Sequence, residues 1–191
     1  YNVQSFPSLN ELLIKSDAVS IVTPTNSHYS VAVEALNQDC HLFIEKPITD
    51  NIKHAELLLN KAKKLKKIIQ VGHIERFNPA YSLLKNSDIQ PRFIEAHRLA
   101  EFNPRGNDVP VILDLMIHDL DIILSMIQSD IIDIRANGVK VVSSTVDIAN
   151  ARIEFKTGCV ANVTASRISQ KNMRKMRLFQ EKDYITLDFQ K

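Results

Sequence analysis

The chain has 191 residues, of which 45% are hydrophobic and 24% charged, and its formal net charge is +2. This composition is close to that of average folded proteins, and it excludes a disordered tail, a collagen-like repeat and a disulfide-stapled mini-protein. No apolar run reaches the length of about 18 residues that a membrane helix needs, and the small net charge gives no sign of nucleic-acid binding. We therefore expect neither a membrane nor a nucleic acid as a partner.

The sequence contains two cysteines, Cys40 and Cys159, which lie in apolar surroundings and do not form a CxxC pair. Buried, reduced cysteines of this kind are typical of proteins in a reducing compartment. We therefore expect a cytoplasmic protein without disulfides.

The first 72 residues alternate between helices and short apolar strands. Ser8 and Glu11 have the spacing of a capping box, which predicts a short helix, and Asp50 can cap a later one. Strands are predicted at 18–22, 41–44 and 68–71, with a further helix at 29–37. Strands that alternate with helices favour βαβ crossovers and a parallel sheet.

Ligands of parallel sheets bind beyond the carboxyl ends of the strands. Three segments rich in hydrogen-bonding groups follow the predicted strands, at residues 23–26, 45–47 and 73–78. Their shared position predicts a ligand site at this edge of the sheet.

The pattern changes after Pro79. A strand is predicted at 93–99 and a long helix at 111–127. Further strands, with turns at Gly138 and Gly158, are predicted at 139–142, 148–155, 160–166 and 184–189. Successive strands after one helix favour an α+β domain with a mostly antiparallel sheet, so the predicted fold class is α/β, with domains at 1–76 and 77–191.

The long predicted helix carries a polar stripe. Asp114 and His118 are four residues apart and share a face, and Asp121 lies one turn further. An imidazole beside a carboxylate can act as a general base near neutral pH, but a hydrogen-bonded surface histidine would show the same pattern. A metal site is not favoured, because no second ligand cluster has suitable spacing.

Lys46 stands between Glu45 and Pro47 at the end of a predicted strand. A lysine there can polarise or protonate an oxygen in a crevice, or it can simply be a solvated strand end. The tripeptide alone leaves both interpretations open.

Three motifs in this order resemble the glucose–fructose oxidoreductase and inositol dehydrogenase family (Gfo/Idh/MocA): Thr23-Pro24-Thr25-Asn26-Ser27-His28, then Phe43-Ile44-Glu45-Lys46-Pro47, then Asp114-x-x-x-His118. The resemblance covers nearly the whole chain and implies a sugar dehydrogenase that uses NAD or NADP on a partial Rossmann-like domain. It implies that Lys46, Asp114 and His118 act on the substrate hydroxyl and that the Lys46–Pro47 bond is cis. It also implies a homo-oligomer, a dimer or tetramer formed through the open sheet face, and the following cofactor-lining residues: Thr23, Pro24, Asn26, His28, Glu45, Lys46 and Arg76.

The segment from Gly72 to Pro79 resembles the branch that oxidises nucleotide-linked amino sugars, such as UDP-N-acetylglucosamine 3-dehydrogenases. A nucleotide sugar carries a diphosphate, which arginine binds well through its planar fork. The candidates are Arg98, Arg105 and Arg167, although each alone could be a surface or ion-paired arginine. A basic run from Lys171 to Arg177 is predicted to be a solvated loop, with a substrate phosphate contact as the alternative.

The sequence departs from the family at the turn that holds the cofactor pyrophosphate. None of its four glycines forms the pattern G-x-G-x-x-G. We therefore expect the chain to begin midway through the dinucleotide-binding domain and to bind cofactor incompletely. A non-catalytic sugar- or nucleotide-sensing module of the same fold is the alternative function, and the presence of both Lys46 and His118 favours the enzyme.

Overall fold

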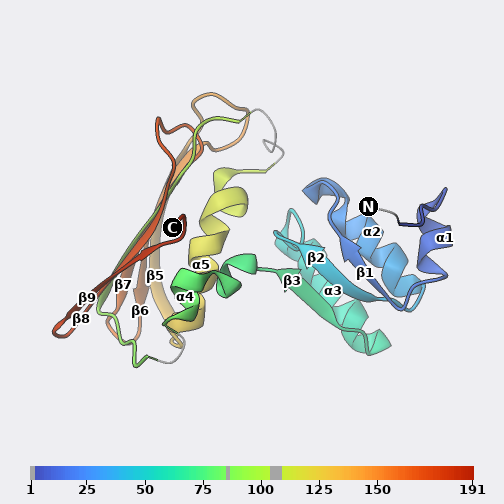
Figure 1. The fold of residues 1–191 in the computed structure, drawn as a ribbon, viewed down its shortest axis with the longest axis horizontal. Helices are drawn as coiled ribbons and strands as arrows, with labels where there is room; N and C mark the ends of the chain where they lie inside the picture. Colours follow the sequence, from blue (N-terminus) through green and yellow to red (C-terminus); the bar gives the residue numbers. More distant parts are fainter. Residues whose placement is uncertain (1–2, 85–86, 104–108) are drawn as a thin grey trace. The chain divides into compact units, whose positions relative to one another are not determined.

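The computed structural model describes residues 3–84, 87–103 and 109–191. The chain divides into two compact units, Tyr1–Gly72 and His73–Lys191 (Figure 1). This division lies before the predicted one, which followed residue 76. The reason is that Glu75 and Arg76 already bind side chains of the second unit.

The first unit contains a three-stranded parallel sheet in the order β1-β2-β3. Its elements are α1 (Leu9–Leu13), β1 (Ala18–Ile21), α2 (Thr25–Asn37), β2 (His41–Glu45), α3 (Ile52–Leu65) and β3 (Ile69–Gly72). Right-handed crossovers between strands in sequential order place both connecting helices on one face. In agreement, α2 and α3 contact each other, and Ala32, Ile44 and Leu58 belong to one buried cluster.

The observed first residues and caps of the helices agree only in part with those predicted from the sequence. Ser8 caps α1 as predicted, accepting the Glu11 N–H at 3.3 Å. Asn51, rather than Asp50, caps α3, because its side chain accepts the His54 N–H at 2.9 Å. Helix α2 begins at Thr25, ahead of the predicted start at 29.

The second unit contains a six-stranded sheet in the order β5-β6-β7-β4-β8-β9. All neighbouring strands are antiparallel except β4 and β7, which run parallel. The strands are β4 (Phe93–Leu99), β5 (Ile131–Val139), β6 (Ile148–Phe155), β7 (Val160–Ser166), β8 (Met173–Gln180) and β9 (Asp183–Asp188). A parallel sheet followed by a mostly antiparallel one confirms the predicted fold class.

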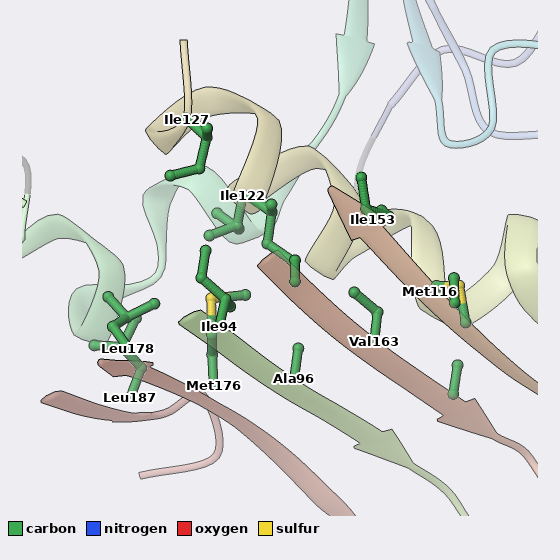
Figure 2. Close-up of a cluster of buried hydrophobic side chains, with 14 of the residues drawn as sticks. Ile94, Ala96, Met116, Ile122, Ile127, Ile153, Val163, Met176, Leu178 and Leu187 are labelled. Carbon is green, nitrogen blue, oxygen red and sulfur yellow. The ribbon is translucent and has the colours of Figure 1, made fainter. Parts of the chain in front are cut away.

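One face of the six-stranded sheet packs against the helix predicted at 111–127. Ile94 and Ala96 of β4, Val163 of β7 and Met176 of β8 are fully buried, and Figure 2 shows them below Ile122 of the helix. Removing aliphatic side chains from water at about 25 cal/mol per Å² stabilises this arrangement. The packing fixes the helix, and with it the polar residues the helix carries.

The long predicted helix is not regular. It begins as a π-helical turn, η2 (Ile112–Met116), and continues as the α-helix α5 (Ile117–Met126). Two short elements that the sequence analysis did not predict precede β4: the 3₁₀ turn η1 (Ile74–Phe77) and the helix α4 (Pro79–Ser82). No helix within the described residues combines the length and the apolar character needed to cross a membrane.

Two predictions in the second unit are wrong. The strand predicted at 139–142 lies earlier in the chain, as β5, which includes Gly138 and ends at Val139. It ends there because the residues after Val139 fold around the buried carboxylate of Asp147. The basic run predicted as a loop lies largely in β8, where buried Met176 and Leu178 alternate with outward-facing charges. Arg177 of that run binds Glu95 of β4 at 2.6 Å.

Candidate functional site

In the first unit, the predicted cofactor residues gather at the carboxyl ends of β1 and β2. Thr23 and Pro24 follow β1 and are exposed, as is Asn26 in the first turn of α2. Glu45 and Lys46 are half-buried at the end of β2. Hydroxyl and amide groups near a helix N-terminus suit the hydroxyls and phosphates of a nucleotide.

His28 lies beneath these loops and is only 1% exposed. Its Nδ1 is 2.9 Å from the carbonyl oxygen of Pro47, and its Nε2 is 2.9 Å from that of Thr23. The family resemblance implied that His28 lines the cofactor. The structure instead commits both ring nitrogens to the backbone, so the side chain supports the loops and offers no free group to a ligand.

Glu45 and Lys46 are placed by the neighbouring strand end. Glu45 pairs with Gly72 in the sheet register, and a Cβ on Gly72 would lie 3.1 Å from Glu45 Oε2. The missing side chain therefore lets the carboxylate lie over β3, where Oε2 also accepts the Lys46 N–H at 3.3 Å. The Lys46–Pro47 bond is cis, as the resemblance implied.

Asp114 and His118 belong to the second unit, on either side of the change from π- to α-helix. Both are half-buried. Single π-helical turns inside α-helices occur frequently at functional sites. A carboxylate and an imidazole on neighbouring turns can share and move a proton, so this segment is the candidate for acid–base chemistry.

Arg76, which was expected at the cofactor, forms a fork with Asp121. Its Nε and Nη2 each donate to one carboxylate oxygen of Asp121 at 2.6 Å. The hydrogen bond with Asp121 raises the pKa of Arg76. His73 Nδ1 also lies 3.7 Å from Asp121 Oδ1, so the segment after β3 is held against α5.

Arg98 does not match its predicted role in binding a diphosphate. It is 2% exposed, and its guanidinium donates twice to Asp119, at 2.9 and 3.0 Å, and once to Glu75, at 3.3 Å. Burial raises the pKa of Asp119, and the hydrogen bonds from Arg98 oppose that rise. Arg98 is therefore an ion-paired core residue, which the sequence analysis had named as the alternative.

Arg167 also offers no exposed phosphate site. Arg167 is 4% exposed and donates from Nη2 to the carbonyl oxygen of Val109 at 2.6 Å. Arg105 lies outside the described residues. Across the ranges that the structure describes, no three His, Cys, Asp or Glu side chains form a group that could hold a metal ion.

Comparisons with known proteins cover both units. Residues 1–73 match the oxidoreductase family with an NAD-binding Rossmann fold, and residues 63–186 match the GFO/IDH/MocA C-terminal domain. The chain is 42% identical over 187 residues to UDP-N-acetylglucosamine 3-dehydrogenase of Acidithiobacillus ferrooxidans, covering 97% of this chain and 60% of that protein. It is 30% identical to scyllo-inositol 2-dehydrogenase (NAD(+)) of Bacillus subtilis, covering 80% of this chain and 49% of that protein.

A solved structure of the Acidithiobacillus enzyme superimposes with a TM-score of 0.91, covering 98% of this chain and 62% of that one. The chain thus spans about 60% of the length of this relative.

Proposed function

Because this chain belongs to the Gfo/Idh/MocA oxidoreductase family, we propose that the protein is a dehydrogenase that transfers hydride between NAD or NADP and a secondary alcohol of a sugar or nucleotide sugar. The observation that carries the proposal is the placement of the three motif groups. Lys46 follows a parallel strand at its carboxyl end, and Asp114 and His118 flank a π-helical turn. Ligands of parallel sheets bind at the carboxyl ends of the strands, and π-helical turns are frequent at functional sites, so both positions support the proposal.

The residues at the carboxyl edge of the first unit fit part of a dinucleotide. Exposed Thr23 and Asn26 offer a hydroxyl and an amide beside the N-terminus of α2, which suits ribose hydroxyls and phosphate oxygens. We propose that Thr23, Pro24, Asn26, Glu45 and Lys46 line the cofactor. When bound, the nicotinamide supplies the hydride acceptor.

The chain's own residues then accept the proton from the reacting oxygen and stabilise the negative charge on it. We propose that His118 accepts the hydroxyl proton as general base, while the ammonium of Lys46 stabilises the negative charge that develops on the oxygen. Asp114 orients the imidazole or the substrate. These roles match the chemistry of the side chains, because an imidazole can accept a proton and an ammonium can stabilise a negative charge.

The finer proposal is that the substrate is a nucleotide-linked amino sugar. It is supported by the 42% identity to a UDP-N-acetylglucosamine 3-dehydrogenase. Of the three arginines named from the sequence, Arg105 stays the candidate for the diphosphate, since Arg98 and Arg167 are engaged in the core. We also propose a dimer or tetramer formed through the open face of the six-stranded sheet, which carries cross-strand pairs such as Arg177–Glu95.

The test uses the complete protein that contains these residues, with NADH absorbance as the readout. Lys46→Met and His118→Asn should each lower kcat by about 10²- to 10⁴-fold, because both groups act on the reacting oxygen. His118→Asn should also leave NAD affinity within a few-fold, since His118 is not among the proposed cofactor-lining residues. Lys53→Met and His54→Asn, on helix α3, are the matched controls. Near-normal turnover of either test variant would refute the role assigned to that residue, whereas an unmodified protein that binds the sugar without oxidising it would favour the sensing module.

The same assay tests the substrate class. UDP-N-acetylglucosamine should be oxidised faster than free N-acetylglucosamine or myo-inositol. Faster oxidation of either uncharged compound would contradict the nucleotide-sugar proposal and leave a polyol dehydrogenase.

A further inference from the structure

The polar face of α5 continues beyond the candidate general base. His118, Asp121 and Ser125 are separated by three and four residues, so they lie on one face of the helix. The proposed function uses only His118. The side chain of Asp121 is 10% exposed, and a carboxylate that is largely removed from water needs a partner to remain charged.

The segment that follows β3 provides partners along this face. Arg76 of η1 places its Nε and Nη2 atoms 2.6 Å from the two carboxylate oxygens of Asp121. One turn further along α5, the Ser125 hydroxyl forms a 2.8 Å hydrogen bond with the hydroxyl of Tyr81 in α4. The segment therefore lies along α5, and its η1 end is the one nearest His118 (Figure 1).

Side-chain contacts hold η1 to two different elements. Glu75 accepts a hydrogen bond from Arg98 of β4 at 3.3 Å, which ties η1 to the sheet. The fork of Arg76 ties the same turn to α5. A guanidinium that donates twice to one carboxylate fixes the orientation of its partner as well as the distance. Arg76 thus sets η1 relative to the helix that carries His118.

We propose that Arg76 and Asp121 form a positioning pair, which keeps η1 fixed against α5 one turn from His118 and so preserves the geometry in which that imidazole meets the substrate hydroxyl. A general base works only within hydrogen-bond reach of the proton it removes, and a displacement of about 1 Å can cost about 10²-fold in rate. The kinetic consequence rests on the proposed function of His118, whereas the pairing itself does not.

The pairing has a spectroscopic test that needs no activity. In the nitrogen-15-labelled chain, the Nε–H of Arg76 should have an order parameter above about 0.6, the value below which a group counts as flexible. Arg135 is the internal comparison, because its Nε donates to Asp133 at 2.9 Å from a side chain that is 77% exposed. Its order parameter should be lower than that of Arg76. An Arg76 value below about 0.6 would overturn the pair.

The positioning role is tested by kinetics on the complete protein. Arg76→Met and Asp121→Asn should each lower kcat by about 10- to 10²-fold, because η1 is then free to move beside His118. Arg76→Lys keeps the charge without the planar fork and should recover part of the loss. Arg135→Met, which removes the exposed pair on β5, should leave kcat unchanged. Backbone amide signals of β4, in the same unit as every substituted residue, show that each variant has folded.

A double variant separates positioning from a merely structural role. If the pair acts through His118, adding Asp121→Asn to His118→Asn should lower kcat by less than about twofold further, because the base to be positioned is already absent. A structural defect would multiply the loss in both backgrounds. A further loss as large as that of Asp121→Asn alone would refute the positioning role.

The outcomes also separate the two proposals. An unmodified protein that oxidises no sugar refutes the proposed function and leaves the nitrogen-15 result for Arg76 standing. An active protein in which Arg76→Met and Asp121→Asn both keep normal kcat refutes the positioning role and leaves the assignment of His118 intact.

Discussion

Replacing Arg98 by Met should destabilise the second unit strongly, because it leaves Asp119 buried without its ion-pair partner and removes one of the two arginines near Glu75, the other being Arg174 at 3.9 Å. Asp119 is 1% exposed and Glu75 is 9% exposed, and Arg98 supplies hydrogen bonds to both. Met retains much of the apolar stem of Arg98, so the loss is mainly electrostatic. Removing one partner of a buried ion pair costs about 3–5 kcal/mol, a large share of the roughly 5–15 kcal/mol that stabilises a typical domain.

The assay is native-state hydrogen exchange of the β4 amides of Ile94 and Ala96, which reports the free energy of opening for this sheet alone. The matched control is Arg92→Met, which breaks an ion pair with Glu181 whose side chains are 75% and 69% exposed. An exposed pair of this kind contributes at most about 1 kcal/mol. A double variant, Arg98→Met with Asp119→Leu, should recover part of the loss, since an apolar pair can replace a buried ionic one.

The pH dependence gives an independent check. Burial already raises the pKa of Asp119, and without the opposing hydrogen bonds of Arg98 it should rise further. A carboxyl whose pKa is raised in the folded state loses its contribution to stability as pH increases through that value. The difference in free energy of unfolding between the unmodified protein and Arg98→Met should therefore become smaller as pH falls. A loss below about 1 kcal/mol, equal to that of Arg92→Met, would refute the reasoning.

Two further predictions concern groups outside the proposed site. The Ser143 hydroxyl and the backbone N–H groups of Val141, Val142 and Ser143 hold the pKa of Asp147 well below its ordinary value of 3.8, so its contribution to stability should be lost as pH falls below that value. Asp147→Asn should lower Tm at pH 7 and flatten the acid limb of the Tm profile; an unchanged acid limb would contradict this role. Burial raises the pKa of Cys159 to about 11, so neither it nor buried Cys40 should react with an aromatic disulfide reagent at pH 8 before unfolding. Rapid labelling of the native chain would show that a thiol is accessible.

The sequence predicted those features whose cause is local. The Ser8 cap depends on Glu11, three residues away, and the parallel strands follow from short apolar runs between helical patterns. The change to successive strands after Pro79 predicted the second sheet. Its strand β8 was missed because charged residues dominate the run, although the alternation of Met176 and Leu178 was a signal that could have revealed it.

The sequence predicted the candidate site only in part. Lys46, Asp114 and His118 were found as motif residues, and their roles stay predictions. The π-helical turn at Asp114 was not predicted, since a helix of regular pattern and one with a widened turn have the same sequence signature here.

The tertiary structure alone decided what each charged or polar side chain binds. The sequence named His28, Arg76 and Arg98 as ligand contacts, but the fold brings a carbonyl 19 residues away to His28 and carboxylates 45 and 21 residues away to the two arginines. The physical reason is that a polar group in the interior must find a partner, and packing and strand register determine which partner lies within reach. The sequence by itself determined the elements, their order and the types of groups available, because these depend on neighbours along the chain. Which of those groups remain open to a ligand depends on neighbours in space.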